Sequence, residues 1–328
     1  MSCNIIITGG AGFIGFNLVE TLLQDKNNNV TVWDNFVSSS KENIENLMKL
    51  RKNPRFHLLL HDVEDSNKDL LDLTAGSVDQ IYHLACPASP KFYQKDPVKT
   101  LNTCYIGTRN MLELAKTTGA TLLFTSTSEV YGDPLEHPQS EEYRGNVNPI
   151  GTRACYDSGK RVAETLCFDY HRKFGVKIRV ARIFNTYGPK MRMDDGRVVS
   201  NFIVQALKGS DLTIYGDGSQ TRSFCYVSDT VRGLIALMNS TVIGPVNIGN
   251  PDEYTVLQLA DKIKELVEWK YGRKIAYIYK DLPKDDPTRR KPAIEKAKKE
   301  LDWEPTITLN LGLGHTIAYF ENLMKSKI

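Results

Sequence analysis

The fold follows from one stretch near the N-terminus, Ile5-Ile6-Ile7-Thr8-Gly9-Gly10-Ala11-Gly12-Phe13-Ile14-Gly15. A short apolar run ends in glycines spaced three residues apart, at positions 9, 12 and 15. The first glycine permits a tight turn, the second lets a pyrophosphate approach the backbone, and the third lets a helix pack close to the strand. Free N–H groups at the start of that helix would then bind phosphate. The stretch therefore predicts a strand, a dinucleotide-binding turn and a helix.

Apolar runs of the same kind recur along the first half of the chain. They are rich in Ile, Val and Leu and lack polar alternation, as expected of parallel strands that are buried on both faces. The runs cover residues 5–8, 30–33, 56–60, 81–85, 122–125 and 178–183. Longer segments between them, such as 97–118 and 156–174, can form crossover helices. The sequence therefore predicts an α/β fold with a doubly wound parallel Rossmann sheet.

The second half of the chain has a looser pattern, which Gly and Pro interrupt repeatedly. Two segments, 256–267 and 313–324, still have apolar residues at helical spacing. We expect a smaller mixed C-terminal domain that binds substrate at the carboxyl edge of the sheet, where ligands of such sheets lie. The predicted domains are residues 1–183, to which a segment around 220–250 returns, and residues 184–328.

Composition argues against several classes of protein. The chain has 328 residues with 42 Lys and Arg against 39 Asp and Glu. Its net charge of +3 gives no electrostatic reason to expect nucleic acid or an anionic membrane as a partner. No apolar run approaches the roughly 18 residues that cross a bilayer, and no basic stretch precedes the first apolar segment as in a signal peptide. The six cysteines include no CxxC pair and the six histidines are scattered, so we expect no metal site. Scattered cysteines in a chain of this length also predict reduced thiols and hence a cytoplasmic protein.

An acidic residue stands where the second predicted strand ends. Asp34 lies 19 positions after Gly15 (34 − 15), close to the spacing at which dinucleotide-binding folds place a carboxylate for the adenosine ribose. That carboxylate would repel a 2′-phosphate, so the sequence favours NAD over NADP. The alternative is a cluster of turn glycines in an α/β protein that binds no dinucleotide, with Asp34 as a helix cap.

Tyr156 and Lys160 are four residues apart, so a helix places both side chains on one face. A tyrosine with a pKa of about 10 is a poor base at neutral pH, but a neighbouring ammonium and a positive nicotinamide ring would lower that pKa. Such a pair also occurs by chance on helix surfaces. The hydroxyl-rich segment 125–132 contains one carboxylate and follows the fifth apolar run at the ligand edge of the sheet. This position favours the catalytic interpretation.

With Asn185 in the segment 184–189, these motifs make the chain resemble the extended short-chain dehydrogenase/reductase family. Within that family the sequence is most similar to the UDP-glucuronate decarboxylases, and the resemblance covers nearly the whole chain. The stretches that carry it are 129–134, 145–151, 195–202, 220–224 and 286–292.

The resemblance implies a cycle with no net oxidation. NAD oxidises the sugar of UDP-glucuronate at C4, carbon dioxide leaves from C6, and NADH returns the hydride to give UDP-xylose. Tyr156 would take the proton of the 4-hydroxyl, and Thr127 would bind near O4. Arg290 would pair with the carboxylate or with developing negative charge, and Glu129 would assist proton movement at C5. The implied catalytic residues are Tyr156, Lys160, Thr127, Glu129 and Arg290.

Binding roles follow from the same resemblance, with 184–328 as the nucleotide-sugar-binding domain. The residues expected to bind NAD are Gly9, Gly12, Phe13, Ile14, Gly15, Asp34, Asn35, Leu84, Tyr156, Lys160, Thr186 and Arg197. The residues expected to bind substrate are Ser128, Asn185, Asn201, Arg222 and Arg289. Alternatively, Arg289 and Arg290 belong to a surface ion-pair patch with Asp285 and Asp286, which would contribute little stability.

Three positions depart from the family pattern. The chain has Asn102 where Lys is common, Arg144 where Trp is usual and Ser158 where Glu is usual. These changes leave the residues of hydride transfer intact. They bear on the affinity for the uronate and on whether the 4-keto pentose is reduced before its release.

Other interpretations stay open. A 4,6-dehydratase normally has an Asp–Glu pair where this chain has Ser128 and Glu129, and a serine cannot replace that acid. A 4-epimerase needs no decarboxylation site and would leave the Arg290 region unexplained. A protein that senses NAD or a nucleotide sugar would not need Tyr156 and Lys160. The resemblance also implies a homodimer in which helices 97–118 and 156–174 form a four-helix bundle, unless their apolar faces pack only on their own sheet.

Overall fold

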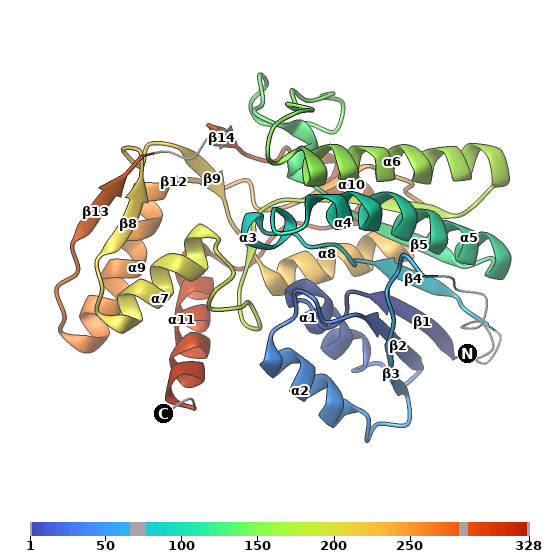
Figure 1. Ribbon diagram of the computed structural model, residues 1–328, viewed down its shortest axis with the longest axis horizontal. Helices are drawn as coiled ribbons and strands as arrows, with labels where there is room; N and C mark the ends of the chain where they lie inside the picture. The colour runs from blue at the N-terminus through green and yellow to red at the C-terminus, as the bar shows by residue number, and fades with distance from the viewer. Residues whose placement is uncertain (1, 66–76, 282–287, 327–328) are drawn as a thin grey trace.

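The computed structural model describes residues 2–65, 77–281 and 288–326. Its centre is a seven-stranded parallel sheet in the order β11-β6-β5-β4-β1-β2-β3 (Figure 1). The strands are β1 (Cys3–Thr8), β2 (Asn28–Asp34), β3 (Phe56–Leu60), β4 (Gln80–His83), β5 (Thr121–Thr127), β6 (Ile178–Ile183) and β11 (Val246–Ile248). The predicted doubly wound α/β fold is confirmed.

Helices cover both faces of the sheet, which explains why its strands lack polar alternation. Successive residues of a strand point to opposite faces. Ile5 and Ile7 accordingly belong to one buried cluster, whereas Ile6 belongs to another. The first cluster includes residues of α1 (Phe13–Leu22), α2 (Lys41–Leu50), α8 (Val227–Asn239) and α10 (Glu295–Leu301), and the second includes residues of α5 (Thr108–Thr118) and α6 (Ala154–Phe174).

The seventh strand was not among the predicted runs. β11 has only three residues, too few for a periodic signal, and it pairs with β6 in a register that joins Val246 to Ala181. Residues 227–248, which comprise α8 and β11, therefore lie in the Rossmann half of the molecule. The domain boundaries themselves stay a prediction.

The predicted helix over 97–118 has an irregular centre. It begins as α4 (Pro97–Asn102), where the Asp96 side chain caps the N-terminus by accepting a hydrogen bond from the Lys99 N–H at 2.9 Å. It continues as a π-helical turn, η2 (Thr103–Gly107), and then as α5, which ends at Gly119 in the left-handed conformation. The shorter elements α3 (Pro90–Tyr93) and η3 (Ser128–Tyr131) follow β4 and β5.

A second lobe has its own apolar core and lies to one side of the sheet (Figure 1). α7 (Val198–Lys208), α9 (Val256–Tyr271) and α11 (Leu309–Lys325) pack around the strand pair β8 (Leu212–Tyr215) and β13 (Tyr277–Lys280). Thr255 and Gln258 form a capping box at the start of α9, which explains the abrupt change from loop to helix.

Small strand pairs connect the two lobes. β7 (Thr186–Tyr187) pairs with β10 (Cys225–Tyr226), and β9 (Thr221–Ser223) lies between β12 (Glu253–Thr255) and β14 (Arg289–Arg290). The register of β14 with β9 places Arg290 opposite Arg222. Because directly paired residues point to the same face of a sheet, these two arginines become neighbours.

Candidate active site

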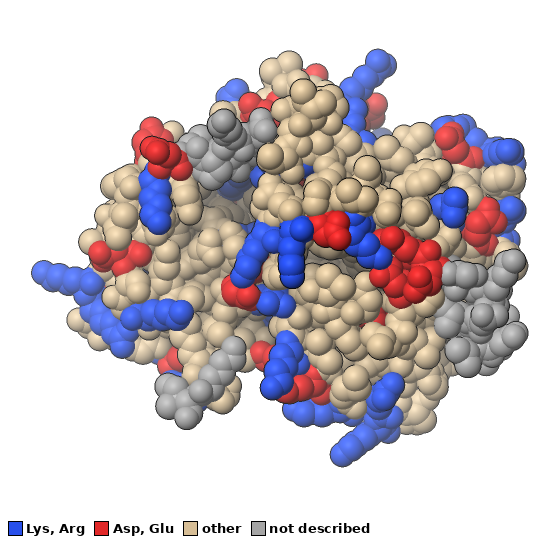
Figure 2. Space-filling view, viewed as in Figure 1, with Lys and Arg blue, Asp and Glu red and all other residues tan. Residues whose placement is uncertain are grey.

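A cavity of about 660 Å³ lies at the carboxyl edge of the sheet, between the two lobes. Figure 2 shows the surface hollowed there, with Lys and Arg side chains at the rim. All but three of the residues with an expected role line it: Gly9, Gly12, Phe13, Ile14, Gly15, Leu84, Thr127, Ser128, Glu129, Tyr156, Lys160, Asn185, Thr186, Arg197, Asn201, Arg222 and Arg290. The three that do not line it are Asp34, Asn35 and Arg289.

The glycine turn leaves no room for larger side chains. A Cβ at Gly9, whose φ is +73°, would lie 2.8 Å from the Ala85 nitrogen, and a Cβ at Gly15 would lie 2.2 Å from the Gly9 carbonyl oxygen. Helix α1 begins after Gly12, and no side chain of the described residues caps it. Its first backbone N–H groups can therefore bind an anion, so this cradle fits the pyrophosphate of a dinucleotide.

Asp34 stabilises this turn by a hydrogen bond and does not itself line the cavity. Its Oδ2 accepts a hydrogen bond from the Ala11 N–H at 2.9 Å, and its Oδ1 accepts one from the Phe36 N–H at 2.7 Å. Burial raises the pKa of Asp34, and these hydrogen bonds oppose that shift. Asn35 is exposed and donates to the Asp62 carboxylate, away from the cavity. The cavity at this end is instead lined by Ser38, Ser39, Ser40 and Asn43, which sequence reasoning missed.

Tyr156 is buried in the wall of the cavity. Its ring stacks on that of Tyr93, with centroids 5.0 Å apart and planes 2° from parallel. Burial raises the pKa of Tyr156 well above its ordinary value, while hydrogen bonding with Thr127 and the charge of Arg197 lower it. In the chain alone burial therefore outweighs the predicted lowering.

The Lys160 ammonium lies near both the Tyr156 ring and the end of β5. Its Nζ donates to the Thr125 carbonyl at 2.8 Å and lies 5.9 Å from the centroid of the Tyr156 ring. The ammonium is thus held at the end of β5, on the side of α6 that carries the Tyr156 ring.

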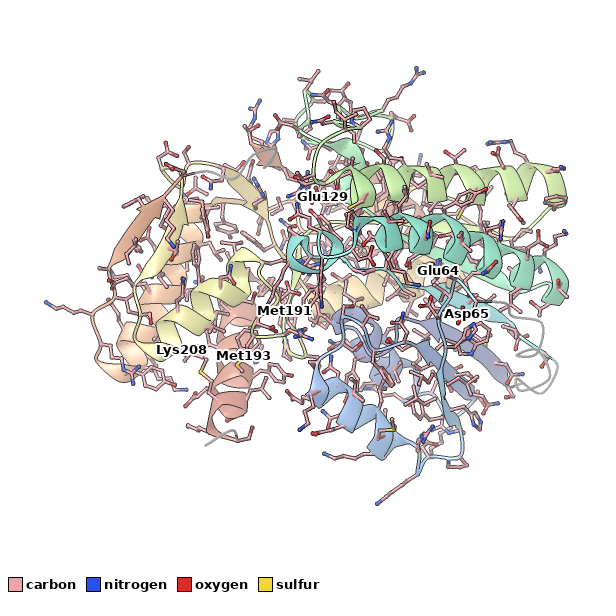
Figure 3. All side chains as sticks on the ribbon, in the orientation of Figure 1. Glu64, Asp65, Glu129, Met191, Met193 and Lys208 are labelled. Atoms are coloured by element: carbon pink, nitrogen blue, oxygen red, sulfur yellow. The ribbon has the colours of Figure 1, made fainter. Side chains whose placement is uncertain are left out.

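Glu129 binds two guanidinium groups. Oε2 accepts a hydrogen bond from Arg153 Nη2 at 2.7 Å, and Oε1 is paired with Arg290 Nη1. Although burial opposes the shift, the two arginines lower the pKa of Glu129 to about 2, so it is an anion at neutral pH. Figure 3 shows Glu129 between the start of α6 and β14. Sequence reasoning missed Arg153, although it stands one helical turn before Tyr156.

Strand alternation separates Arg290 from Arg289. Arg290 is 2% exposed, lines the cavity and donates from Nη2 to the Gly132 carbonyl at 2.9 Å. Arg289, the preceding residue of β14, is exposed and lies outside the cavity wall, because neighbouring residues of a strand point in opposite directions. Asp285 and Asp286, the suggested partners in a surface patch, lie outside the described residues.

Polar side chains from the second lobe complete the wall. Arg197 Nη2 donates to the Ala88 carbonyl at 2.7 Å, and Asn201 Nδ2 donates to the Gly196 carbonyl at 3.0 Å. These contacts position the start of α7 at the edge of the cavity. The residues that sequence reasoning did not assign but that line the cavity with charge are Arg153, Lys190, Arg192 and Lys280.

The departures from the family pattern lie elsewhere. Asn102, Arg144 and Ser158 are all absent from the residues that line the cavity within the described part of the chain. His83 is buried between Thr8 and Thr108, with ring nitrogens 2.7 and 3.1 Å from their hydroxyl oxygens. Within residues 2–65, 77–281 and 288–326, no cluster of three or more His, Cys, Asp or Glu side chains has metal-site geometry, and no helix is long and apolar enough to span a bilayer.

Comparisons with known proteins assign this site to a family. Residues 6–316 match a family model described as GDP-mannose 4,6 dehydratase. UDP-glucuronic acid decarboxylase 6 from Arabidopsis thaliana is 58% identical over 309 residues, covering 94% of this chain and 86% of that protein. The chain belongs to the UDP-glucuronic acid decarboxylase family. A second decarboxylase of that family, from Xenopus tropicalis, is 57% identical and covers 96% of this chain and 72% of its own length.

Solved structures share the fold at lower identity. The UDP-glucuronic acid 4-epimerase from Bacillus cereus, solved with UDP-glucuronic acid and NAD, superposes with a TM-score of 0.85 at 30% identity and covers 98% of this chain and 99% of its own. The decarboxylase family thus has the same architecture as an epimerase. Fold alone therefore does not separate the two reactions.

Proposed function

We propose that this chain decarboxylates UDP-glucuronate to UDP-xylose in an NAD-dependent cycle through a 4-keto intermediate. The observation that carries the proposal is the meeting of Tyr156 and the Glu129–Arg290 pair in one cavity with the glycine turn. The family relatives named decarboxylases support the same reaction.

NAD bound by the glycine turn of this cavity would supply the hydride acceptor for C4 of the sugar and later the hydride donor. Tyr156 accepts the proton of the 4-hydroxyl, and Thr127 hydrogen-bonds with it and so lowers its pKa. The resulting 4-ketone is β to the C6 carboxylate, and loss of carbon dioxide leaves an enolate whose charge rests on O4. Tyr156 and Thr127 are the donors that stabilise this oxygen.

In this proposal Arg290 binds the substrate carboxylate only weakly. A guanidinium that bound the carboxylate strongly would stabilise the ground state, because that negative charge disappears as neutral carbon dioxide forms. Glu129 already neutralises Arg290, and Gly132 accepts a second hydrogen bond from it. The pair therefore orients the C6 group while leaving its charge incompletely compensated.

Glu129 is an orienting anion rather than the acid in this proposal. With a pKa of about 2 it carries no proton to donate to C5 at neutral pH. As an anion between Arg153 and Arg290 it can orient a water molecule whose proton is delivered to C5 after carbon dioxide leaves. The hydroxide that remains takes up one proton from solvent, and this is the one proton that the net reaction consumes.

The second lobe would bind the UDP part of the substrate. Arg222 lies beside Arg290 through the β9–β14 register and lines the cavity, which supports a role for its guanidinium in binding a diphosphate oxygen. Asn185 and Asn201 line the same region and offer amide groups. Residues 1–183 with the later returning segment form the dinucleotide domain of this proposal, and residues 184–328 form the nucleotide-sugar domain.

The finer proposal for assembly is a homodimer. Large apolar side chains are exposed along α4, η2 and α6, which pack side by side: Val98, Leu101, Tyr105, Val162 and Phe174. Two copies that bring these helices together would form a four-helix bundle and bury the apolar side chains. We also place the protein in the cytoplasm, since all six of its cysteines are free thiols.

Product analysis with purified protein, UDP-glucuronate and NAD tests the proposed reaction. UDP-xylose with an equal amount of carbon dioxide is the expected result. A UDP-uronate epimer without carbon dioxide would make the chain an epimerase, and consumption of UDP-glucose would favour a dehydratase. Binding without turnover of any UDP-sugar would favour a sensor.

A further inference from the structure

Two free thiols meet in the wall of the cavity. Cys86 follows β4 and lines the cavity, whereas Cys104 is 2% exposed within the π-helical turn η2. Their Sγ atoms are 3.4 Å apart, although 18 residues separate them in sequence. A disulfide has an S–S length of about 2.05 Å, so the sulfurs need to approach by only about 1.4 Å.

The two thiols differ in their surroundings. Hydrogen bonding with Cys104 lowers the pKa of Cys86, although burial opposes the shift, and the charge of Lys160 lowers it further. The same interaction and burial raise the pKa of Cys104. Cys86 faces the cavity, from which a small oxidant can arrive, whereas Cys104 is buried, so Cys86 is the thiol that a peroxide reaches first.

We propose that Cys86 and Cys104 are a redox modification site, at which a peroxide converts the two thiols to an intramolecular disulfide that lowers the activity of the adjoining cavity. The Cys86 thiolate attacks one peroxide oxygen, the O–O bond breaks, and a sulfenic acid and hydroxide form. The Cys104 sulfur then attacks Sγ of Cys86, its proton leaves, and the S–O bond breaks to release water. Overall, two thiols and one hydrogen peroxide give one disulfide and two waters.

Formation of this disulfide would displace the loop that carries Cys86 rather than the helix turn that carries Cys104. Cys104 is fixed by close packing, because a Cβ at Gly159 of α6 would lie 3.1 Å from its Sγ. Cys86 lies on a loop whose neighbours Leu84 and Ala88 line the cavity, and the Ala88 carbonyl accepts the hydrogen bond from Arg197. A displacement of about 1 Å in this loop would alter the wall that contacts cofactor and substrate, and misplacements of that size at an active site can cost about 100-fold in rate.

Cys155 offers a matched comparison. It lies near the same region, and its thiol contacts the Tyr93 carbonyl at 3.7 Å. The structure gives it no cysteine partner at hydrogen-bond distance within the described chain. A disulfide at this site should therefore use Cys104 and leave Cys155 reduced.

The test treats the whole protein with hydrogen peroxide and maps its disulfides by mass spectrometry after tryptic digestion. The expected result is a link between the peptides ending at Lys91 and Arg109, formed in wild type and in Cys155→Ser but absent from Cys104→Ala. The linked fraction should track a loss of kcat/KM of at least about tenfold, and dithiothreitol should reverse both together. No such link in wild type, a link that uses Cys155, or a link with unchanged kcat/KM would overturn the proposal.

The activity readout rests on the proposed decarboxylation, but the mass of the linked peptides does not. If the reduced protein fails to turn over UDP-glucuronate, the proposed function fails while the disulfide remains measurable. If the reduced protein is active and no link forms, only the redox site fails.

Discussion

The guanidinium of Arg153 binds the carboxylate of Glu129, with Nη2 2.7 Å from Oε2. The two side chains are 16% and 15% exposed, so water screens the pair only weakly. Arg290 occupies the other oxygen of the same carboxylate. Glu129 therefore has its charge and its direction fixed by residues from the start of α6 and from β14.

Arg153→Met should lower kcat and stability together, because it keeps the aliphatic stem but removes one of the two cations that hold Glu129. We expect a loss of about tenfold or more in kcat and about 2 kcal/mol in the free energy of unfolding. Arg172→Met on the same helix is the control, since its pair with Asp169 is largely exposed and should contribute less than about 1 kcal/mol. Equal effects of the two variants in urea unfolding and steady-state kinetics would contradict this role.

Glu129 should make stability depend on pH in the acidic range. Its pKa is about 2 in the folded chain against an ordinary value of 4.5, so its contribution is fully present above 4.5 and is lost as the pH falls towards 2. Glu129→Gln carries no such charge, and its free energy of unfolding should fall less steeply than that of wild type over this range. Urea unfolding at a series of pH values measures the difference, and parallel curves would refute the linkage.

Tyr156→Phe should abolish turnover while leaving the fold intact. The ring can still stack on Tyr93, but the group that accepts the 4-hydroxyl proton is gone, so kcat should fall about 10³-fold. Tyr82→Phe is the matched control: this buried hydroxyl in β4 has no hydrogen-bond partner among the described residues and lies outside the cavity wall. Near-normal kcat for Tyr156→Phe would remove the proposed base.

Gly15→Ala should weaken dinucleotide binding, because its Cβ would lie 2.2 Å from the Gly9 carbonyl oxygen and would displace the turn. An increase of at least about tenfold in the Kd for NAD is expected by calorimetric titration. Gly314→Ala in α11 meets nothing within 4 Å and should raise stability by about 0.5–1 kcal/mol with unchanged binding. Unaltered NAD affinity in Gly15→Ala would argue against the pyrophosphate site.

Replacing exposed apolar side chains of α4 and α6 with charged ones should prevent dimer formation. The double variant Val98→Glu/Val162→Glu is expected to halve the mass measured by light scattering, since burying two carboxylates in each copy is costly. Trp269→Glu, at an exposed position on α9 in the other lobe, should leave the mass unchanged. A monomeric wild type, or a double variant that stays dimeric, would exclude this bundle.

Much of the architecture could be predicted because its signals are local. The runs 5–8 and 122–125 lack polar alternation because helices cover both faces of their strands. The turn at Gly9 and Gly15 can be recognised from the sequence, because close backbone contacts exclude a Cβ there and so require glycine. β11 was not predicted as a strand, because three residues are too few to show a hydrophobic periodicity.

For the candidate site, too, the sequence predicted what depends on local spacing, and only the tertiary structure showed which distant residues meet. Tyr156 and Lys160 share a helix face through their spacing alone, so the sequence by itself was enough to pair them. Only the tertiary structure placed Arg222 beside Arg290, Arg153 against Glu129, and Cys86 against Cys104. Only the tertiary structure shows that burial raises the pKa of Tyr156 in the chain alone, because burial depends on all the segments that pack around a group. Local periodicity determines which elements form, whereas strand register and packing between distant segments decide which charges and thiols become neighbours.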